Sequence, residues 1–170
     1  IFLNSGIAAV KKLAKDGIYL KKINQQKSLK NKKILILCGK GNNGGDGLAA
    51  ARQLSQLHAD IIIYLVSEQN EYQKTALLQL SIAKKMKLQI RSVKNKTALA
   101  KDLACANLII DAVFGSGFTG KVMEPLAGLF QKINKAKKPL LAVDLPSGIN
   151  ATTGKCENIA LKALFTVTFQ

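Results

Sequence analysis

The stretch CGKGNNGGDGLAAARQL, Cys38 to Leu54, decides the fold. It follows the apolar run KILILC (Lys33–Cys38) and turns directly into a segment with the small-residue and leucine spacing of a helix. Gly39, Gly41 and Gly44 match G-x-G-x-x-G, whose glycines allow a tight turn and a close approach of a dinucleotide pyrophosphate to the helix N-terminus. The stretch therefore predicts the first strand, loop and helix of an α/β sheet.

An acid, Asp46, makes this loop unusual, because it stands near the point where a bound phosphate would come closest. Asp46 either caps the helix GLAAARQL that follows it or belongs to a different kind of site. In both cases a pyrophosphate lying directly on the helix is disfavoured. Glu68, 24 residues after Gly44, is either the ribose-binding acid of the fingerprint or an exposed loop acid. The pattern G-x-x-x-x-G-K-[ST] is absent, so the loop is not a phosphate-binding P-loop.

Apolar strand-like runs and amphipathic segments alternate through the rest of the chain. The expected strands after the first lie at residues 59–66, 88–93, 107–115, 139–148 and 163–170. The expected helices lie at residues 47–57, 72–87, 97–106 and 123–138, the last with Pro125 in its first turn. Strands that are apolar on both faces and alternate with helices predict a mostly parallel sheet in a Rossmann-like three-layer α/β/α sandwich.

Length and composition predict a single domain over residues 1–170. The chain has 170 residues, 48% hydrophobic residues and three prolines, enough for one sizeable core. Residues 1–33 predict one or two helices beside the sheet, and we expect further chain beyond both ends. The apolar runs are far shorter than the roughly 20 residues of a bilayer span, and no leader pattern precedes them. We expect a cytoplasmic protein without a membrane segment.

The three cysteines favour neither a disulfide framework nor a zinc site, because they are widely spaced and only one histidine, His58, accompanies them. Cys38 and Cys105 stand in apolar context and are expected to be buried, whereas Cys156 stands in a polar stretch that suits an exposed position.

The formal net charge of +16 raises the question of nucleic-acid binding. Only two of the basic residues are arginine (Arg52 and Arg91), and no aromatic side chains alternate with the lysines to stack on bases. Many lysines fall at the expected ends of helices, where they complement the helix dipole. The charge therefore favours solubility, and nucleic acid is not the expected partner.

The polar residues of the chain gather in three loops, those after the first, fourth and fifth expected strands. Because the carboxyl ends of parallel strands share one edge, the three loops should meet there. Asn42 and Asn43 come from the first loop, Asp111 from the second, and Asp144 and Ser147 from the third. Such carboxylate, amide and hydroxyl oxygens predict a site for a hard cation, beside a free carboxylate for proton transfer.

Three motifs in order resemble a known family: GKGNNGGDGLAAARQL at 39–54, IIDAVFGSGFTG at 109–120 and LAVDLPSGINATTG at 141–154. They resemble the NAD(P)H-hydrate epimerases, the YjeF N-terminal domain family, and the resemblance covers nearly the whole chain. It implies a Rossmann-like fold, a homodimer, and epimerisation of hydrated NADH and NADPH at C6 of the nicotinamide ring. It also implies a dehydratase, either fused to this domain or separate from it, that uses only the S epimer.

The resemblance also assigns the site. It implies substrate contacts at Asn42, Asn43, Gly44, Gly45 and Asp46, at Gly115, Ser116, Gly117, Phe118, Thr119, Gly120 and Lys121, and at Asp144. It implies a potassium ion on Asn43, Asp111 and Ser147, which leaves Asp144 to move protons. Loss and re-addition of the C6 hydroxyl and opening and reclosing of the ring both remain open as mechanisms, and so does the role of Lys121.

Two other functions stay open. Relatives of this fold serve as RNA-associated scaffolds, which the high positive charge would suit, although the acidic residues of the site are present here. An ordinary nicotinamide oxidoreductase would use the G-x-G-x-x-G loop, but no histidine or tyrosine stands beside the expected nicotinamide pocket.

Overall fold

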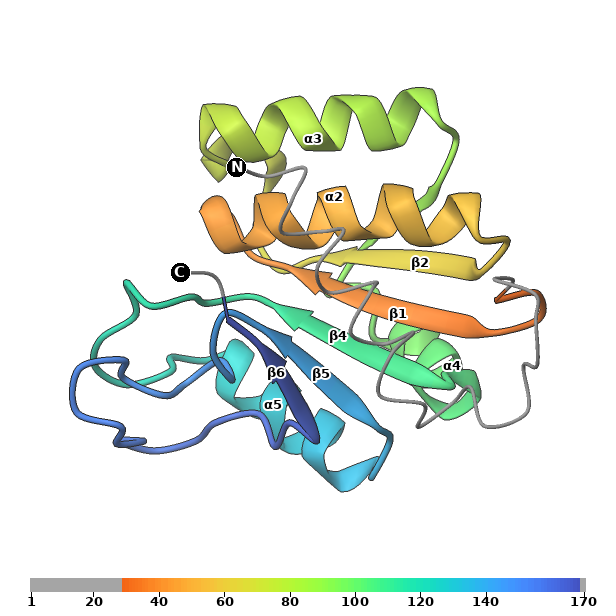
Figure 1. Cartoon of the computed structure of the whole chain (residues 1–170). Coiled ribbons are helices and arrows are strands. Elements are labelled where there is room, and N and C mark those ends of the chain that lie inside the picture. The colour runs from red at the N-terminus through yellow and green to blue at the C-terminus, as the bar shows by residue number, and fades with distance from the viewer. Residues whose placement is uncertain (1–28, 169–170) are drawn as a thin grey trace.

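The computed structural model describes residues 29–168, which form one six-stranded sheet with helices on both faces (Figure 1). The strands are β1 (Lys33–Cys38), β2 (Asp60–Leu65), β3 (Gln89–Ser92), β4 (Leu108–Ala112), β5 (Leu140–Val143) and β6 (Phe165–Val167). The helices are α2 (Asn42–Gln56), α3 (Lys74–Lys85), α4 (Lys96–Cys105) and α5 (Leu126–Lys135), with a 3-10 turn η1 (Gln69–Glu71). The helices expected before β1 fall mainly on residues outside the described range.

The sheet has the strand order β3-β2-β1-β4-β5-β6, and every pairing in it is parallel. This arrangement confirms the predicted Rossmann-like fold. The order reverses between β1 and β4, because the chain first builds the sheet outward from β1 toward β3 and then returns to the other side. Ligands of open α/β sheets bind outside the carboxyl ends of the strands at such a reversal.

Alternate residues of the central strands build two separate cores, which explains the three layers. Ile34 and Ile36 of β1 pack with α2 and α3, whereas Leu35 and Leu37 pack with α4 and α5. All four side chains are almost completely buried. Figure 1 shows α2 and α3 on one side of the sheet and α4 and α5 on the other. A parallel sheet covered on both faces requires such continuous apolar strands.

The start of α2 differs from the sequence prediction. The helix begins at Asn42 with Gly41 as its N-cap, so Asp46 lies inside the helix and does not cap it. The prediction was wrong because the turn after β1 is shorter than the run of glycines suggests. Gly44 permits this tight turn, since a Cβ atom there would lie only 1.7 Å from the carbonyl oxygen of Gly39.

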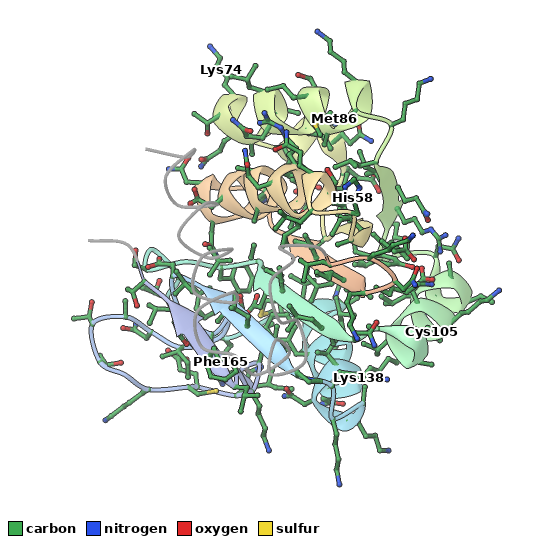
Figure 2. The ribbon with its side chains drawn as sticks, turned by 45° about the vertical axis from the view of Figure 1, so that its right-hand side comes forward. His58, Lys74, Met86, Cys105, Lys138 and Phe165 are labelled. Carbon is green, nitrogen blue, oxygen red and sulfur yellow. The ribbon has the colours of Figure 1, made fainter. Side chains whose placement is uncertain are left out.

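The burial of the cysteines and the position of Pro125 differ in part from the predictions. Cys105 is exposed at the last residue of α4 (Figure 2), so its predicted burial is wrong; the apolar side of this short helix is carried by Leu99 and Leu103. Cys38 is buried as predicted, and burial raises the pKa of its thiol, while Cys156 is exposed. Pro125 is the N-cap of α5, one residue before the helix begins.

Among residues 29–168 the basic residues do not gather on one element. Lys74 lies at the α3 side of the molecule and Lys138 at the opposite, α5 side (Figure 2). Within residues 29–168, no helix is long and apolar enough to cross a membrane.

Candidate active site at the carboxyl edge of the sheet

The loops after β1, β4 and β5 meet at the arrowhead ends of these strands, as the sequence predicts (Figure 1). Asp111, in β4, is fully buried and accepts hydrogen bonds from Ser147, which lies in the loop after β5. The Ser147 hydroxyl donates to Oδ1 of Asp111 at 2.6 Å, and the Ser147 amide donates to Oδ2 at 2.8 Å. The Val113 amide adds a third hydrogen bond at 3.1 Å. Residues 36 positions apart are thereby joined at the core of the site.

Asn43 joins the same cluster from the first turn of α2. Its side-chain amide donates to the carbonyl oxygen of Phe114 at 2.8 Å, and the Phe114 amide donates in turn to the Ser147 hydroxyl oxygen at 2.8 Å. These contacts fix the orientation of the Asn43 side chain. Its oxygen, Oδ1, is buried and has no hydrogen-bond partner among residues 29–168. A buried acceptor without a partner is costly, so this atom marks a place for a ligand.

The electrostatics of Asp111 also fit a cation. Burial raises the pKa of its carboxyl to about 6, although the hydrogen bonds from Ser147 and Val113 lower it. No ion pair within the described part of the chain involves this carboxyl. A buried negative charge without a counter-charge is unfavourable. Together with the Asn43 oxygen and the Ser147 hydroxyl, it offers the oxygen ligands that an alkali or other hard cation takes.

Asp144 stands directly after β5 on the same edge of the sheet. Its backbone adopts the left-handed conformation with φ of 70°, in which aspartate is more common than most other residues. The Asp144 amide donates to the carbonyl oxygen of Val167 at 2.8 Å, which extends the pairing of β5 with β6 by one bond. Its carboxylate accepts a 2.6 Å hydrogen bond from the amide of Ser116. Backbone and side chain together direct this carboxylate toward the loop after β4.

The carboxylate of Asp144 and the side chain of Asn43 meet at Gly115. A Cβ atom on Gly115 would lie 2.8 Å from Oδ2 of Asp144 and 3.3 Å from Cβ of Asn43. The three predicted loops therefore converge on one small region, where Asn43, Gly115 and Asp144 lie close together.

The remaining residues of the two predicted substrate segments lie in α2 and in the loop after β4. Asn42 is exposed and accepts a hydrogen bond from the Thr75 hydroxyl at 3.0 Å, so it faces α3 and lies outside the Asp111 cluster. Gly44 and Gly45 are buried in α2, and Asp46 is half-buried one turn into the helix. In the second segment Phe118 stacks on Phe114 with ring centroids 4.4 Å apart, Ser116, Gly117, Thr119 and Lys121 are exposed, and Gly120 has a positive φ.

Glu68 is the exposed loop acid that was the second of the two interpretations of the sequence. It is exposed, caps η1 and pairs with Lys94, so it is a loop acid held by local contacts.

Sequence reasoning missed the contribution of Phe114. Its main-chain N–H and C=O connect Ser147 to Asn43, and its ring supports Phe118. Main-chain contacts carry no residue-type signal, so the only available hint was the position of Phe114 between Asp111 and the glycine run. Gly39 was noted only as part of a turn; a Cβ atom there would lie 1.9 Å from the carbonyl oxygen of Val113, so it lets the loops after β1 and β4 touch.

The fold and the site define the protein as a Rossmann-like α/β domain with a cluster of oxygen-bearing side chains at the reversal of its strand order. A family model described as YjeF-related protein N-terminus matches residues 3–170. The chain belongs to this family.

Curated relatives agree with this assignment. The chain is 41% identical over 147 residues to a bifunctional NAD(P)H-hydrate repair enzyme Nnr of Moorella thermoacetica, covering 85% of this chain and 28% of the relative. It is 40% identical over 136 residues to an NAD(P)H-hydrate epimerase of Weissella koreensis, covering 80% of this chain and 59% of the relative. The chain thus spans less than two thirds of the length of these relatives.

A solved structure shows the same fold. The yeast protein ynu0 superposes with a TM-score of 0.83 at 22% identity, over 99% of this chain and 69% of the yeast chain. A transhydrogenase from Sinorhizobium meliloti superposes with a TM-score of 0.51 at 14% identity, over 98% of this chain and 48% of that chain, which reflects the shared α/β architecture.

Proposed function

We propose that the protein is an NAD(P)H-hydrate epimerase, an isomerase that interconverts the R and S epimers of hydrated NADH and NADPH at C6 of the nicotinamide ring. The observation that carries the proposal is the convergence of Asp111, Ser147, Asn43 and Asp144 on one edge of the sheet. Support comes from the curated relatives, several of which are named NAD(P)H-hydrate epimerase.

Potassium is the cation that we propose for the cluster of Asn43, Asp111 and Ser147. The Asn43 oxygen is buried without a partner among the described residues, and hydrogen bonds through Phe114 and Ser147 link Asn43 to the buried Asp111 carboxylate. A bound potassium ion would be held by the Asn43, Asp111 and Ser147 oxygens and would supply positive charge at the site. The residues themselves hold the loops after β1, β4 and β5 together, so they also set the shape of the pocket.

Asp144 is the residue that we propose to move the proton. In one route its carboxylic acid donates a proton to the departing C6 hydroxyl, which leaves as water and gives a ring cation. The resulting carboxylate then accepts a proton from the water that adds to either face of C6, which restores the acid. In the other route the ring opens and recloses, and Asp144 transfers protons between the oxygen of the C6 hydroxyl and the ring. The Ser116 amide holds one carboxyl oxygen of Asp144 at 2.6 Å, which leaves the other oxygen for proton transfer in either route.

A dehydratase is the functional partner that this activity requires, because an epimerase alone only interconverts the two hydrates. The relatives from Moorella thermoacetica and Thermofilum pendens are described as bifunctional repair enzymes, and this chain matches only 28% and 26% of their lengths. We propose that the epimerase works with a dehydratase, either fused or separate. The homodimer implied by the family resemblance and a cytoplasmic location stay predictions.

The direct test mixes the protein with purified R hydrate in potassium-containing buffer and follows the S hydrate by chromatography. Appearance of S until both epimers reach a constant ratio supports the proposal. An unchanged R hydrate, together with RNA binding that weakens steeply with salt, would instead favour the RNA-associated scaffold.

A further inference from the structure

The carboxylate of Asp144 is held by two neighbouring residues of the loop after β4. The amide of Ser116 donates to its Oδ2 atom at 2.6 Å, slightly shorter than the roughly 2.7–2.9 Å usual for N–H donors to a charged acceptor. Gly115 makes room for this contact, because a Cβ atom on Gly115 would lie 2.8 Å from the same oxygen. Real Cβ atoms do not come this close, so a side chain at 115 would displace the carboxylate.

The Ser116 amide is itself fixed in direction. The Phe118 amide donates to the carbonyl oxygen of Gly115 at 3.0 Å, which closes a turn around Ser116. The Phe118 ring stacks on Phe114, whose main chain is bonded to both Ser147 and Asn43. The turn is therefore anchored to the Asp111 cluster, and the amide of Ser116 is presented at a set place.

Asp144 is fixed from the opposite side by the sheet. Its amide is bonded to Val167 at the end of β6, and its φ of 70° sets the direction in which the side chain leaves the backbone. A carboxylate fastened by its backbone on one side and by one oxygen on the other has a defined orientation. Its second oxygen, Oδ1, is then the atom left for the substrate.

We propose that Gly115 and Ser116 are positioning residues that aim the Asp144 carboxylate at the substrate, an inference that rests on the proposed function. The Ser116 amide is used by Asp144 and is not available to a phosphate group of the substrate. Amides that make no hydrogen bond within residues 29–168 occur further along the loop, at Gly117, Thr119 and Gly120. The loop is thus divided between a part that serves Asp144 and a part that serves the ligand.

Gly115→Ala tests this division by its effect on turnover and on substrate affinity. A displaced carboxylate still lets the substrate bind, so we expect kcat to fall roughly 100-fold while KM changes by less than about threefold. Gly128→Ala, in the first turn of α5 and against only the flexible end of Glu124, is the matched control and keeps kcat.

The Ser116 amide resonance in a ¹⁵N-resolved NMR spectrum provides a readout that does not depend on activity. Strong hydrogen bonding to the carboxylate places it downfield in the wild type; Gly115→Ala and Asp144→Ala both move it upfield. Gly117→Ala leaves it in place, because a Cβ atom there meets nothing within 4 Å. An unmoved Ser116 resonance in Asp144→Ala overturns the positioning role, as does an unchanged kcat in Gly115→Ala when the wild type is active. A wild type without turnover overturns the proposed function and the positioning role together.

Discussion

Ser147 contacts both oxygens of the Asp111 carboxylate, with its hydroxyl 2.6 Å from Oδ1 and its amide 2.8 Å from Oδ2. This pair joins the end of β4 to the loop that leads from β5 to β6, a connection that contains no helix. The contact therefore does two things. It holds a long loop against the sheet, and it builds the negative side of the pocket that we propose for potassium.

Replacement of Ser147 by alanine should lower the free energy of unfolding by about 1–3 kcal/mol, because Asp111 loses one buried donor and the Phe114 amide loses its acceptor. Urea unfolding followed by circular dichroism measures the change. Ser81→Ala is the control, since the Ser81 hydroxyl is exposed and bonds only within α3, and it should change stability by less than about 0.5 kcal/mol. Equal effects of the two substitutions would contradict the buried contact.

Potassium should stabilise the wild type more than choline chloride at the same ionic strength, by up to about 2–3 kcal/mol near saturation. Asn43→Ala should abolish this gain, because it removes the buried oxygen that has no partner among the described residues. Asn42→Ala is the matched control, since the Asn42 side chain contacts Thr75 and lies outside the cluster. Thermal unfolding of the three proteins decides the point, and a full potassium gain in Asn43→Ala would remove this residue from the proposed site.

Gly44→Ala should destabilise the protein by about 3 kcal/mol or more, because the new Cβ atom would lie 1.7 Å from a main-chain oxygen of Gly39 that cannot easily move. Gly41→Ala, three residues earlier in the same motif, meets nothing within 4 Å and should cost less than about 1 kcal/mol as an N-cap change. Chemical denaturation compares the two. A mild effect at Gly44 would mean that the turn after β1 is looser than described.

Tyr64 should make stability fall at high pH. Its buried hydroxyl donates to Asp102, which also pairs with Arg91, and burial followed by the Asp102 hydrogen bond raises its pKa from 10.0 to about 12. The folded state therefore holds this proton more tightly than the unfolded state. The resulting stability is complete below pH 10 and is lost, by up to about 3 kcal/mol, as the pH rises through 12.

Lysines titrate in the same pH range. Comparing the free energy of unfolding in urea of the wild type with that of Tyr64→Phe separates the effect of Tyr64 from theirs. Above pH 10, we expect the free energy of unfolding of the wild type to fall steadily relative to that of Tyr64→Phe. A difference that is independent of pH would show that Tyr64 is not buried against Asp102.

The strands could be predicted from the sequence because burial on both faces forces continuous apolar runs. KILILC matches the bounds of β1, and the parallel direction of the strands was predicted from their alternation with helices, whereas the strand order was not. The start of α2 was misplaced because the sequence does not show how tightly Gly39 and Gly44 pack. Cys105 was misjudged because apolar neighbours in sequence do not reveal which side of a helix faces the sheet.

The candidate site residues could be selected from residue types and from the shared edge of parallel strands. Their pairing could not, because it depends on main-chain groups. The link from Asn43 through Phe114 to Ser147 uses a backbone N–H and C=O, and the partner of Asp144 is the Ser116 amide. The left-handed backbone of Asp144 likewise follows from its tertiary contacts.

The rate at which Asp144→Asn interconverts the R and S hydrates tests the central claim most directly. Asparagine keeps an acceptor for the Ser116 amide but cannot transfer a proton, so the fold and the Ser116 contact should survive. With equal concentrations of wild type and variant in potassium buffer, we expect the interconversion rate seen by chromatography to fall by roughly 10²–10⁴-fold. A variant that equilibrates the two epimers as fast as the wild type would contradict the account.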